Sequence, residues 1–267
     1  MIDQYDRMDL QATVDAGQAE LVADPGHPQG WTLLVNDVAQ SYVDLADPTR
    51  LPMMYARLLA AVADVAAPPR KPVTTLHLGA GGLTLPRYVA ATRPGSRQTV
   101  VEIDRGLVEF VSYGLPLPAT ANISIRIDDA ADAIREIPEH PYELIYSDIY
   151  RGGSTPAPVT GVEFAEHAAA ALAPGGLFVV NVLDATGLLS TRRQVATLRR
   201  VFDEVVVFAG PSMLRGRRDG NVIVLASSRT LPMRRLHAAA ERHEAPLRSL
   251  SGEALDLFVG ATAPVTP

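Results

Sequence analysis

The sequence predicts an α/β fold built on a doubly wound, mainly parallel sheet. Short apolar runs rich in Val and Ile alternate with helical stretches between residues 73 and 226. Such runs are typical of strands covered on both faces, and regular alternation of strands and helices favours parallel pairing. The first run leads into a glycine-rich turn at Gly79 to Gly82 and then a helix, which is the arrangement of a nucleotide-binding sheet.

The individual elements follow from the spacing of the apolar residues. Strands are expected at residues 73–78, 99–103, 123–127, 144–147, 177–183, 204–208 and 222–226. Helical stretches are expected between them at residues 86–91, 129–136, 162–173 and 190–202. Another helix is expected at residues 51–65, because its apolar residues recur at helical spacing and two prolines follow it.

The chain is expected to divide into three parts. Residues 1–66 form a small N-terminal β appendage and a linking helix, since short extended pieces at 20–22 and 31–38 flank a turn-rich segment. Residues 67–232 form a Rossmann-like nucleoside-binding domain. Residues 233–267 form a helical tail that is interrupted by Pro246 and Gly252.

Composition narrows the classes of partner. The chain has 267 residues, a formal net charge of −6 and no cysteine, so it offers no basic surface for nucleic acid and no thiolate. Its six histidines lack metal-ligand spacing, and no metal site is expected. The polar first residues do not resemble a signal peptide, and no run of about 18 apolar residues could span a bilayer. We expect a cytoplasmic protein with a small-molecule partner and no membrane partner.

The strongest functional signal is the turn Gly79-Ala80-Gly81-Gly82 followed by Glu102. Glycines allow the backbone to approach a ligand, and the N-terminus of the next helix offers free N–H groups. An acid at the end of the second strand, about 20 residues later, is where folds of this type grip a ribose. The alternative is that the glycine turn only connects the strand tightly to the helix and binds no ligand.

Acids also follow the third and fourth strands. Asp129 opens a helix, so it can cap that helix, accept from an adenine amino group, or do both, and Asp128 is a weaker candidate for the same ligand. Asp148 stands where the ligand crevice of such sheets forms, although a carboxylate there can also cap a loop. We expect Asp148 to be the base or orienting group, with Tyr146 or Tyr150 supporting it.

Taken together, LHLGAGGLTLPRYV, VVEIDRGLVEF, IRIDDAADAI, YELIYSDIY and LAPGGLFVVNVLD resemble the polyamine aminopropyltransferases, the spermidine and spermine synthase family. The resemblance runs from about Trp31 to Ser227. It implies a small N-terminal β domain on a Rossmann-like domain of the class I AdoMet methyltransferase type. It also implies S-adenosylmethionine (AdoMet) or its decarboxylated form as cofactor, and a homo-oligomer as the assembly.

The resemblance also assigns cofactor-binding roles. It places the glycine loop at Gly79, Ala80 and Gly81, the ribose acid at Glu102 and the adenine acid at Asp129. Upstream, two further positions match the family segment, with Gln40 expected at the cofactor and Tyr55 at the substrate.

Two positions depart from the family pattern. Gly82 replaces the loop aspartate that would pair with the ammonium of decarboxylated AdoMet, and Arg151 replaces the second aspartate after the fourth strand. Without that loop acid, the backbone N–H groups of a helix start would favour the carboxylate of AdoMet. Arg151 would disfavour a polyamine and favour a neutral or anionic acceptor.

The leading interpretation is therefore a spermidine-synthase-like transferase that binds AdoMet and transfers a carbon group, most simply methyl, to a small non-polyamine acceptor. The first alternative is true aminopropyl transfer from decarboxylated AdoMet to a polyamine, with Asp148 acting alone. The second is a catalytically silent nucleoside-binding protein.

Overall fold

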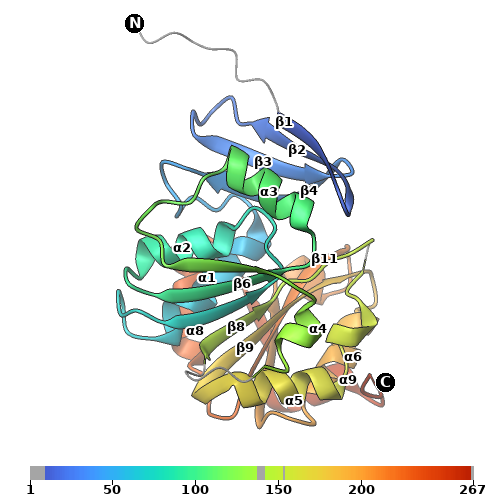
Figure 1. Cartoon of the computed structure of the whole chain (residues 1–267). Coiled ribbons are helices and arrows are strands. Elements are labelled where there is room, and N and C mark those ends of the chain that lie inside the picture. Colours follow the sequence, from blue (N-terminus) through green and yellow to red (C-terminus); the bar gives the residue numbers. More distant parts are fainter. Residues whose placement is uncertain (1–9, 137–141, 153, 266–267) are drawn as a thin grey trace, which may run out of the picture.

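The computed structural model describes residues 10–136, 142–152 and 154–265, in which two separate sheets are formed (Figure 1). The N-terminal sheet is an antiparallel meander in the order β1-β2-β3-β4. Its strands are β1 (Leu10–Val14), β2 (Gly17–Ala23), β3 (Gly30–Val35) and β4 (Val38–Asp44). This confirms the expected β appendage in outline.

The larger sheet has the order β12-β10-β11-β9-β8-β5-β6-β7. Its strands are β5 (Thr74–Leu78), β6 (Arg97–Glu102), β7 (Ile123–Ile127), β8 (Tyr142–Ser147), β9 (Leu172–Asp184), β10 (Glu204–Ala209), β11 (Gly220–Ser227) and β12 (Arg248–Leu250). Pairing is parallel from β7 through β9, whereas β11 runs antiparallel to both β9 and β10. The expected mainly parallel, Rossmann-like sheet is confirmed.

Helices cover both faces of this sheet. They are α1 (Met54–Ala66), α2 (Thr84–Thr92), α3 (Arg105–Gly114), α4 (Ala130–Ala133), α5 (Val162–Ala171), α6 (Leu189–Leu198), α7 (Pro211–Leu214), α8 (Met233–Arg242) and α9 (Gly252–Val259), with a 3-10 turn at Ala157–Val159. One apolar core joins the sheet to α1, α2 and α8, and another joins its opposite face to α4, α5, α6 and α9.

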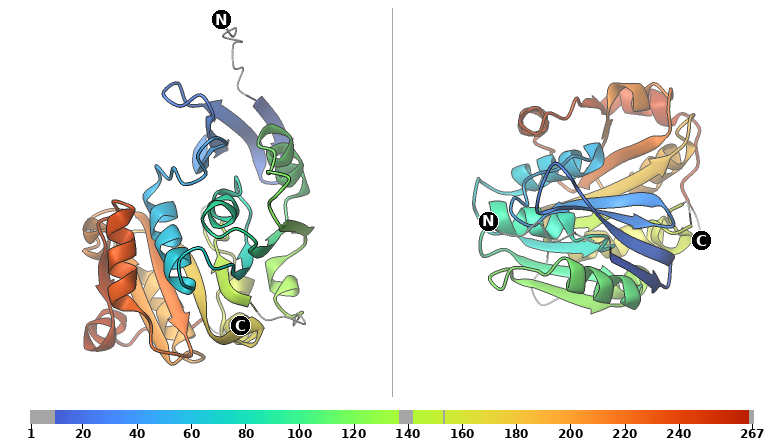
Figure 2. Two further views of the ribbon diagram at one scale, coloured as in Figure 1. Left: turned by 90° about the vertical axis from the view of Figure 1, so that its left-hand side faces the viewer. Right: turned by 90° about the horizontal axis from the view of Figure 1, so that it is seen from above.

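The N-terminal sheet packs on α3, which lies beside it in the left view of Figure 2, and on the glycine turn. Leu21 and Leu33 pack with Phe110 in a separate apolar cluster. Polar contacts join the same surfaces: Thr84 Oγ1 donates to the carbonyl of Tyr42 at 2.9 Å. The turn after β5 is therefore held from above by the N-terminal sheet and from below by the large sheet.

Several expected boundaries were wrong. The extended piece expected at 31–38 contains all but the first residue of β3, a turn at Asn36 and Asp37 with positive φ, and the first residue of β4. The helix expected at 162–173 ends at Ala171, because the backbone extends from Leu172 into β9.

The tail expected to be helical also contributes a strand. β12 pairs antiparallel with β10 at the edge of the large sheet, and a three-residue strand leaves too little periodicity to be predicted. The first residues of the expected N-terminal part, 1–9, and the last residues of the expected tail, 266–267, lie outside the described residues. Within the described part of the chain, no helix combines the length and apolar character that crossing a membrane would require.

Candidate active site

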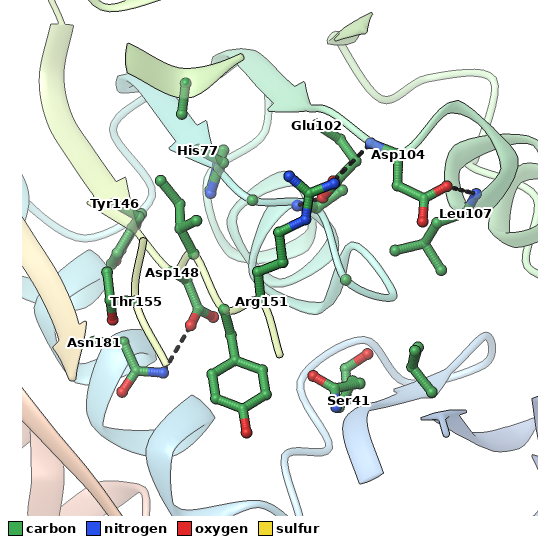
Figure 3. A pocket seen from close by; sticks show the side chains of 18 of the residues that line it. Ser41, His77, Glu102, Asp104, Leu107, Tyr146, Asp148, Arg151, Thr155 and Asn181 are labelled. Carbon is green, nitrogen blue, oxygen red and sulfur yellow. Dashed lines mark hydrogen bonds between the residues drawn. The ribbon is translucent and has the colours of Figure 1, made fainter. Parts of the chain in front are cut away.

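A cavity of about 870 Å³ lies between the N-terminal sheet and the carboxyl ends of the strands of the large sheet. It has the size of a ligand site. Its wall includes almost every site residue expected from the sequence: Gln40, Tyr55, Gly79, Ala80, Gly81, Glu102, Asp128, Asp129, Tyr146, Asp148, Tyr150 and Arg151. Figure 3 shows how side chains from several strands converge on it. Gly82 is the one expected residue that does not line this cavity.

The turn after β5 needs glycine for two reasons. Gly79 has a φ of +96°, and a Cβ there would lie 2.3 Å from the carbonyl oxygen of Asp148. Gly81 has a φ of +48°, also in the left-handed region, and faces the cavity. The turn can therefore pass close to the end of β8, which brings the glycine loop and Asp148 to the same cavity.

Glu102, the last residue of β6, holds this turn in place. Its Oε2 accepts from Ala80 N at 2.8 Å, and its Oε1 accepts from Asp104 N at 3.0 Å. An ionised carboxylate has about four acceptor positions, so each oxygen keeps one for a further donor such as a ribose hydroxyl. The half-buried Glu102 is thus both a support for the turn and an available acceptor at the cavity wall.

Asp129 caps α4 and also lines the cavity. Its Oδ1 accepts from Ala131 N at 2.7 Å, so the capping role weighed from the sequence is present in the structure. The neighbouring Asp128 is ion-paired with Arg126 and accepts from the backbone N–H of Asp129. Of the two acids, Asp129 therefore has more acceptor capacity left for a ligand, because it has no ion-pair partner among the described residues.

Asp129→Asn is expected to weaken adenosine-type ligands about tenfold, because the amide oxygen accepts less strongly than a carboxylate from an amino group. Stability should change little, since asparagine caps a helix about as well as aspartate. Calorimetric titration with methylthioadenosine and a melting curve would measure the two effects. A lowered melting temperature with unchanged affinity would leave Asp129 with the capping role alone.

Asp148 follows β8 directly and is half-buried at the cavity wall. Its Oδ1 accepts from Asn181 Nδ2 at 2.7 Å, drawn as a dashed line in Figure 3. Desolvation raises the pKa of the Asp148 carboxyl above its ordinary value, and the hydrogen bond from Asn181 opposes this shift. A carboxyl with a raised pKa holds a proton more readily, which suits proton transfer.

The tyrosines around Asp148 differ in their partners. Tyr55 donates to the carbonyl of Gln40 at 2.7 Å, and burial raises the pKa of its phenol. Tyr146 donates to the carbonyl of Leu59 at 2.9 Å, so its hydroxyl already serves the packing of α1 on β8. Tyr150 is exposed beside the cavity.

His77 on β5 is buried beneath the site. Its Nε2 lies 2.9 Å from Gln98 Oε1, its ring stacks on Tyr146, and burial lowers its pKa to about 4. His77 is therefore a packed, hydrogen-bonded residue.

Gly82 faces the N-terminal sheet. Its N–H donates to Ser41 Oγ at 2.8 Å, and a Cβ at this position would lie 2.6 Å from the same oxygen. This N–H already donates to β4, so it is not one of the helix-start N–H groups that could meet the carboxylate of AdoMet. Leu83, and not Gly82, adopts positive φ at the start of α2.

Arg151 lies in the loop after β8, exposed at the cavity wall, and Figure 3 shows its side chain extended from that loop. In the described part of the wall it is the only lysine or arginine, and it forms no ion pair there. The acids of the same wall are Glu102, Asp104, Asp128, Asp129 and Asp148.

Ser41, Asn181 and Asn221 are among the polar residues of the wall that sequence reasoning missed. Asn181 had a signal, because it is the one amide inside an otherwise apolar strand. Ser41 had none, since its role depends on how the two sheets dock.

Among the residues that the structure describes, no group of three or more His, Asp or Glu side chains is arranged to hold a metal ion. No protein-family model matches the chain. A polyamine aminopropyltransferase from Vibrio vulnificus strain CMCP6 is 26% identical over 164 residues, 61% of this chain. Those residues are 52% of that protein, so the chain spans about half the length of this curated relative.

Solved structures extend the likeness to the whole chain. A probable spermidine synthase from Corynebacterium glutamicum is 30% identical, with a TM-score of 0.88 over 97% of this chain and 96% of that one. Human methyltransferase-like protein 13 in complex with SAH shares the fold, with a TM-score of 0.55 and 22% identity over 78% of this chain and 92% of that one. These relatives and neighbours are AdoMet-type transferases. The chain belongs to the spermidine synthase family.

Proposed function

We propose that this protein transfers the aminopropyl group of decarboxylated AdoMet to an amine. The observation that carries the proposal is the position of Asp148, a half-buried carboxylate that faces the same cavity as the glycine turn and Glu102. The names of the relatives, a polyamine aminopropyltransferase and a probable spermidine synthase, favour this reaction over others.

The cavity residues fit a nucleoside donor. Each oxygen of Glu102 keeps a free acceptor position for a ribose hydroxyl, and Asp129 is available to an adenine amino group. The positive φ of Gly79 and Gly81 leaves the backbone of the turn open to close approach. A bound sulfonium donor supplies an activated carbon beside a good leaving group.

Asp148 would prepare the acceptor. An amine is protonated at neutral pH and must lose a proton before its nitrogen can attack carbon. Asp148 can hold the ammonium by charge and then take the proton. A new C–N bond forms as the C–S bond breaks, and the products are methylthioadenosine, a protonated secondary amine and the proton taken by Asp148.

The direct test of donor binding is calorimetric titration with decarboxylated AdoMet, AdoMet and methylthioadenosine. The proposal expects binding of decarboxylated AdoMet and of methylthioadenosine. Absence of binding by all three ligands would contradict the proposal, whereas binding without turnover would favour the catalytically silent nucleoside-binding alternative.

Methyl transfer from AdoMet to a non-polyamine acceptor is the second candidate. Two observations favour it: residue 82 is a glycine and so has no carboxylate, and Arg151, which forms no ion pair in the described structure, is free to pair with the carboxylate of AdoMet. The first candidate instead takes support from Asp148 and from the names of the relatives.

Arg151→Gln separates the candidates by their donors. If Arg151 pairs with the AdoMet carboxylate, the variant should bind AdoMet about tenfold more weakly and decarboxylated AdoMet no more weakly, since one charge-assisted contact is lost. Competitive titration of both donors would measure the ratio. The matched control is Arg218→Gln, which changes an exposed arginine outside the cavity. An unchanged donor ratio would remove Arg151 from donor recognition.

A further inference from the structure

Two asparagines form a polar path through an otherwise apolar part of the sheet. Asn181 is buried on β9 between Val180 and Val182, and Asn221 is half-buried at the start of β11. Both line the cavity. In the antiparallel register Asn181 pairs with Ile223, two residues after Asn221, so the two amides lie diagonally on the same face of the sheet.

Hydrogen bonds connect the two amides to each other and to Asp148. Because Ser147 pairs with Val180, the next residues along these parallel strands, Asp148 and Asn181, lie side by side. Asn181 Nδ2 donates to Asp148 Oδ1 at 2.7 Å, and Asn221 Nδ2 donates to Asn181 Oδ1 at 3.1 Å. The path therefore crosses β8, β9 and β11.

The direction of these bonds is set by chemistry. An ionised carboxylate only accepts, so Asn181 must turn its NH₂ group toward Asp148. The amide oxygen of Asn181 then faces away and needs a donor, and Asn221 supplies one. If that donor is lost, the amide oxygen of Asn181 loses its partner in Asn221. The orientation that donates to the ionised carboxylate is then less strongly favoured over the rotated one, in which the amide oxygen accepts from a protonated Asp148.

We infer that Asn221 is a positioning residue: acting through Asn181, it fixes the side chain of Asp148 in its ionised form, pointing into the cavity. The inference rests on the proposed function, in which Asp148 takes a proton from the acceptor. We call Asn221, Asn181 and Asp148 the amide relay. Asn221 need not touch the reacting atoms, because its contribution is to orient the amide of Asn181.

Other groups around the cavity also act on Asp148. The titratable and charged side chains that line the wall with it are Tyr55, His77, Glu102, Asp104, Asp128, Asp129, Tyr146, Tyr150 and Arg151. His77 stays neutral near pH 7 because burial lowers its pKa to about 4. Desolvation is the main cause that raises the pKa of Asp148, and the bond from Asn181 is the cause that lowers it. Removing the relay should therefore move this pKa further upward.

The test uses two variants without a change of charge, Asn181→Leu and Asn221→Leu. Both should raise the pKa of Asp148, the first by deleting the donor and the second by releasing its orientation. Asn122→Leu, an exposed position outside the cavity, is the matched control and should leave this pKa unchanged. A melting curve for each variant establishes that it is folded.

Two measurements report on the amide relay. Carbon NMR of aspartate labelled at the carboxyl carbon gives the pKa of Asp148 directly, with its signal assigned by Asp148→Asn. In the transfer assay, kcat/KM near neutral pH should fall about tenfold in both variants, and the acid limb of the pH profile should move to higher pH. KM for the donor should stay unchanged, because neither asparagine is assigned to donor binding.

A rise in the pKa of Asp148 in both asparagine variants, absent from Asn122→Leu, would support the relay. A rise in Asn181→Leu alone would remove Asn221 from it, and no rise in either would overturn the inference. The NMR readout needs no turnover. If the wild-type protein transfers nothing while both variants move the pKa, the proposed function fails and the relay stands.

Discussion

Asp148→Asn is expected to reduce transfer to an amine by about 10² to 10⁴-fold, the usual contribution of a positioned base. The amide can neither hold an ammonium by charge nor take its proton. The oxygen of the introduced amide can still accept from Asn181, so the end of β8 should keep its conformation. Steady-state kinetics with decarboxylated AdoMet and a diamine would measure the loss.

The pH dependence of the wild-type enzyme belongs to the same expectation. Since the pKa of Asp148 is raised by desolvation, kcat/KM should rise with pH through a value above that of an ordinary aspartate. The matched control is Asp203→Asn, at an exposed position outside the cavity. Equal rates for Asp148→Asn and the wild type would exclude Asp148 as the base.

Glu102→Ala is expected to weaken binding of methylthioadenosine more than about a hundredfold. Loss of two charge-assisted hydrogen bonds to ribose costs about 3 kcal/mol or more. The structure adds a second reason, because Glu102 also accepts from Ala80 N and Asp104 N and so holds the glycine turn. Calorimetric titration gives the affinity, and circular dichroism shows whether the domain stays folded.

A suitable control is Glu109→Ala, which removes an exposed glutamate from α3 outside the cavity. It should bind methylthioadenosine like the wild type. If Glu102→Ala keeps full affinity while folded, then the ribose is not bound at the end of β6 and the orientation of the donor must be reconsidered.

The convergence of Gly79, Glu102, Asp129 and Asp148 on one cavity could be predicted from the sequence. Each stands at the end of an apolar run or within two residues after it, and the carboxyl ends of parallel strands share one edge of the sheet. The strand pattern therefore predicts which of these residues meet at the cavity. The roles given to these residues in binding and catalysis remain predictions.

Contacts between the two sheets could not be predicted in this way. Ser41 meets Gly82 only because the N-terminal sheet docks on the glycine turn, 41 residues further along the chain. No local pattern announces such a contact. Because Ser41 accepts from Gly82 N, this N–H is not among the free N–H groups that the sequence led us to expect for the carboxylate of AdoMet at the start of the helix.

The contact between Asn181 and Asn221 could not be predicted either, because it depends on the antiparallel direction of β11. Continuous apolar runs do not reveal strand direction, and only the reversal of β11 against β9 brings Asn221 beside Asn181. A sheet taken as parallel throughout would have left this amide without an assigned partner.

The central claim is aminopropyl transfer to an amine, and mass spectrometry of the products tests it most directly. Purified protein would be incubated with a series of diamines and either decarboxylated AdoMet or AdoMet. The account predicts methylthioadenosine together with an aminopropylated amine from the decarboxylated donor, and loss of both products in Asp148→Asn. Release of S-adenosylhomocysteine from AdoMet, with no methylthioadenosine from the decarboxylated donor, would contradict it and favour methyl transfer.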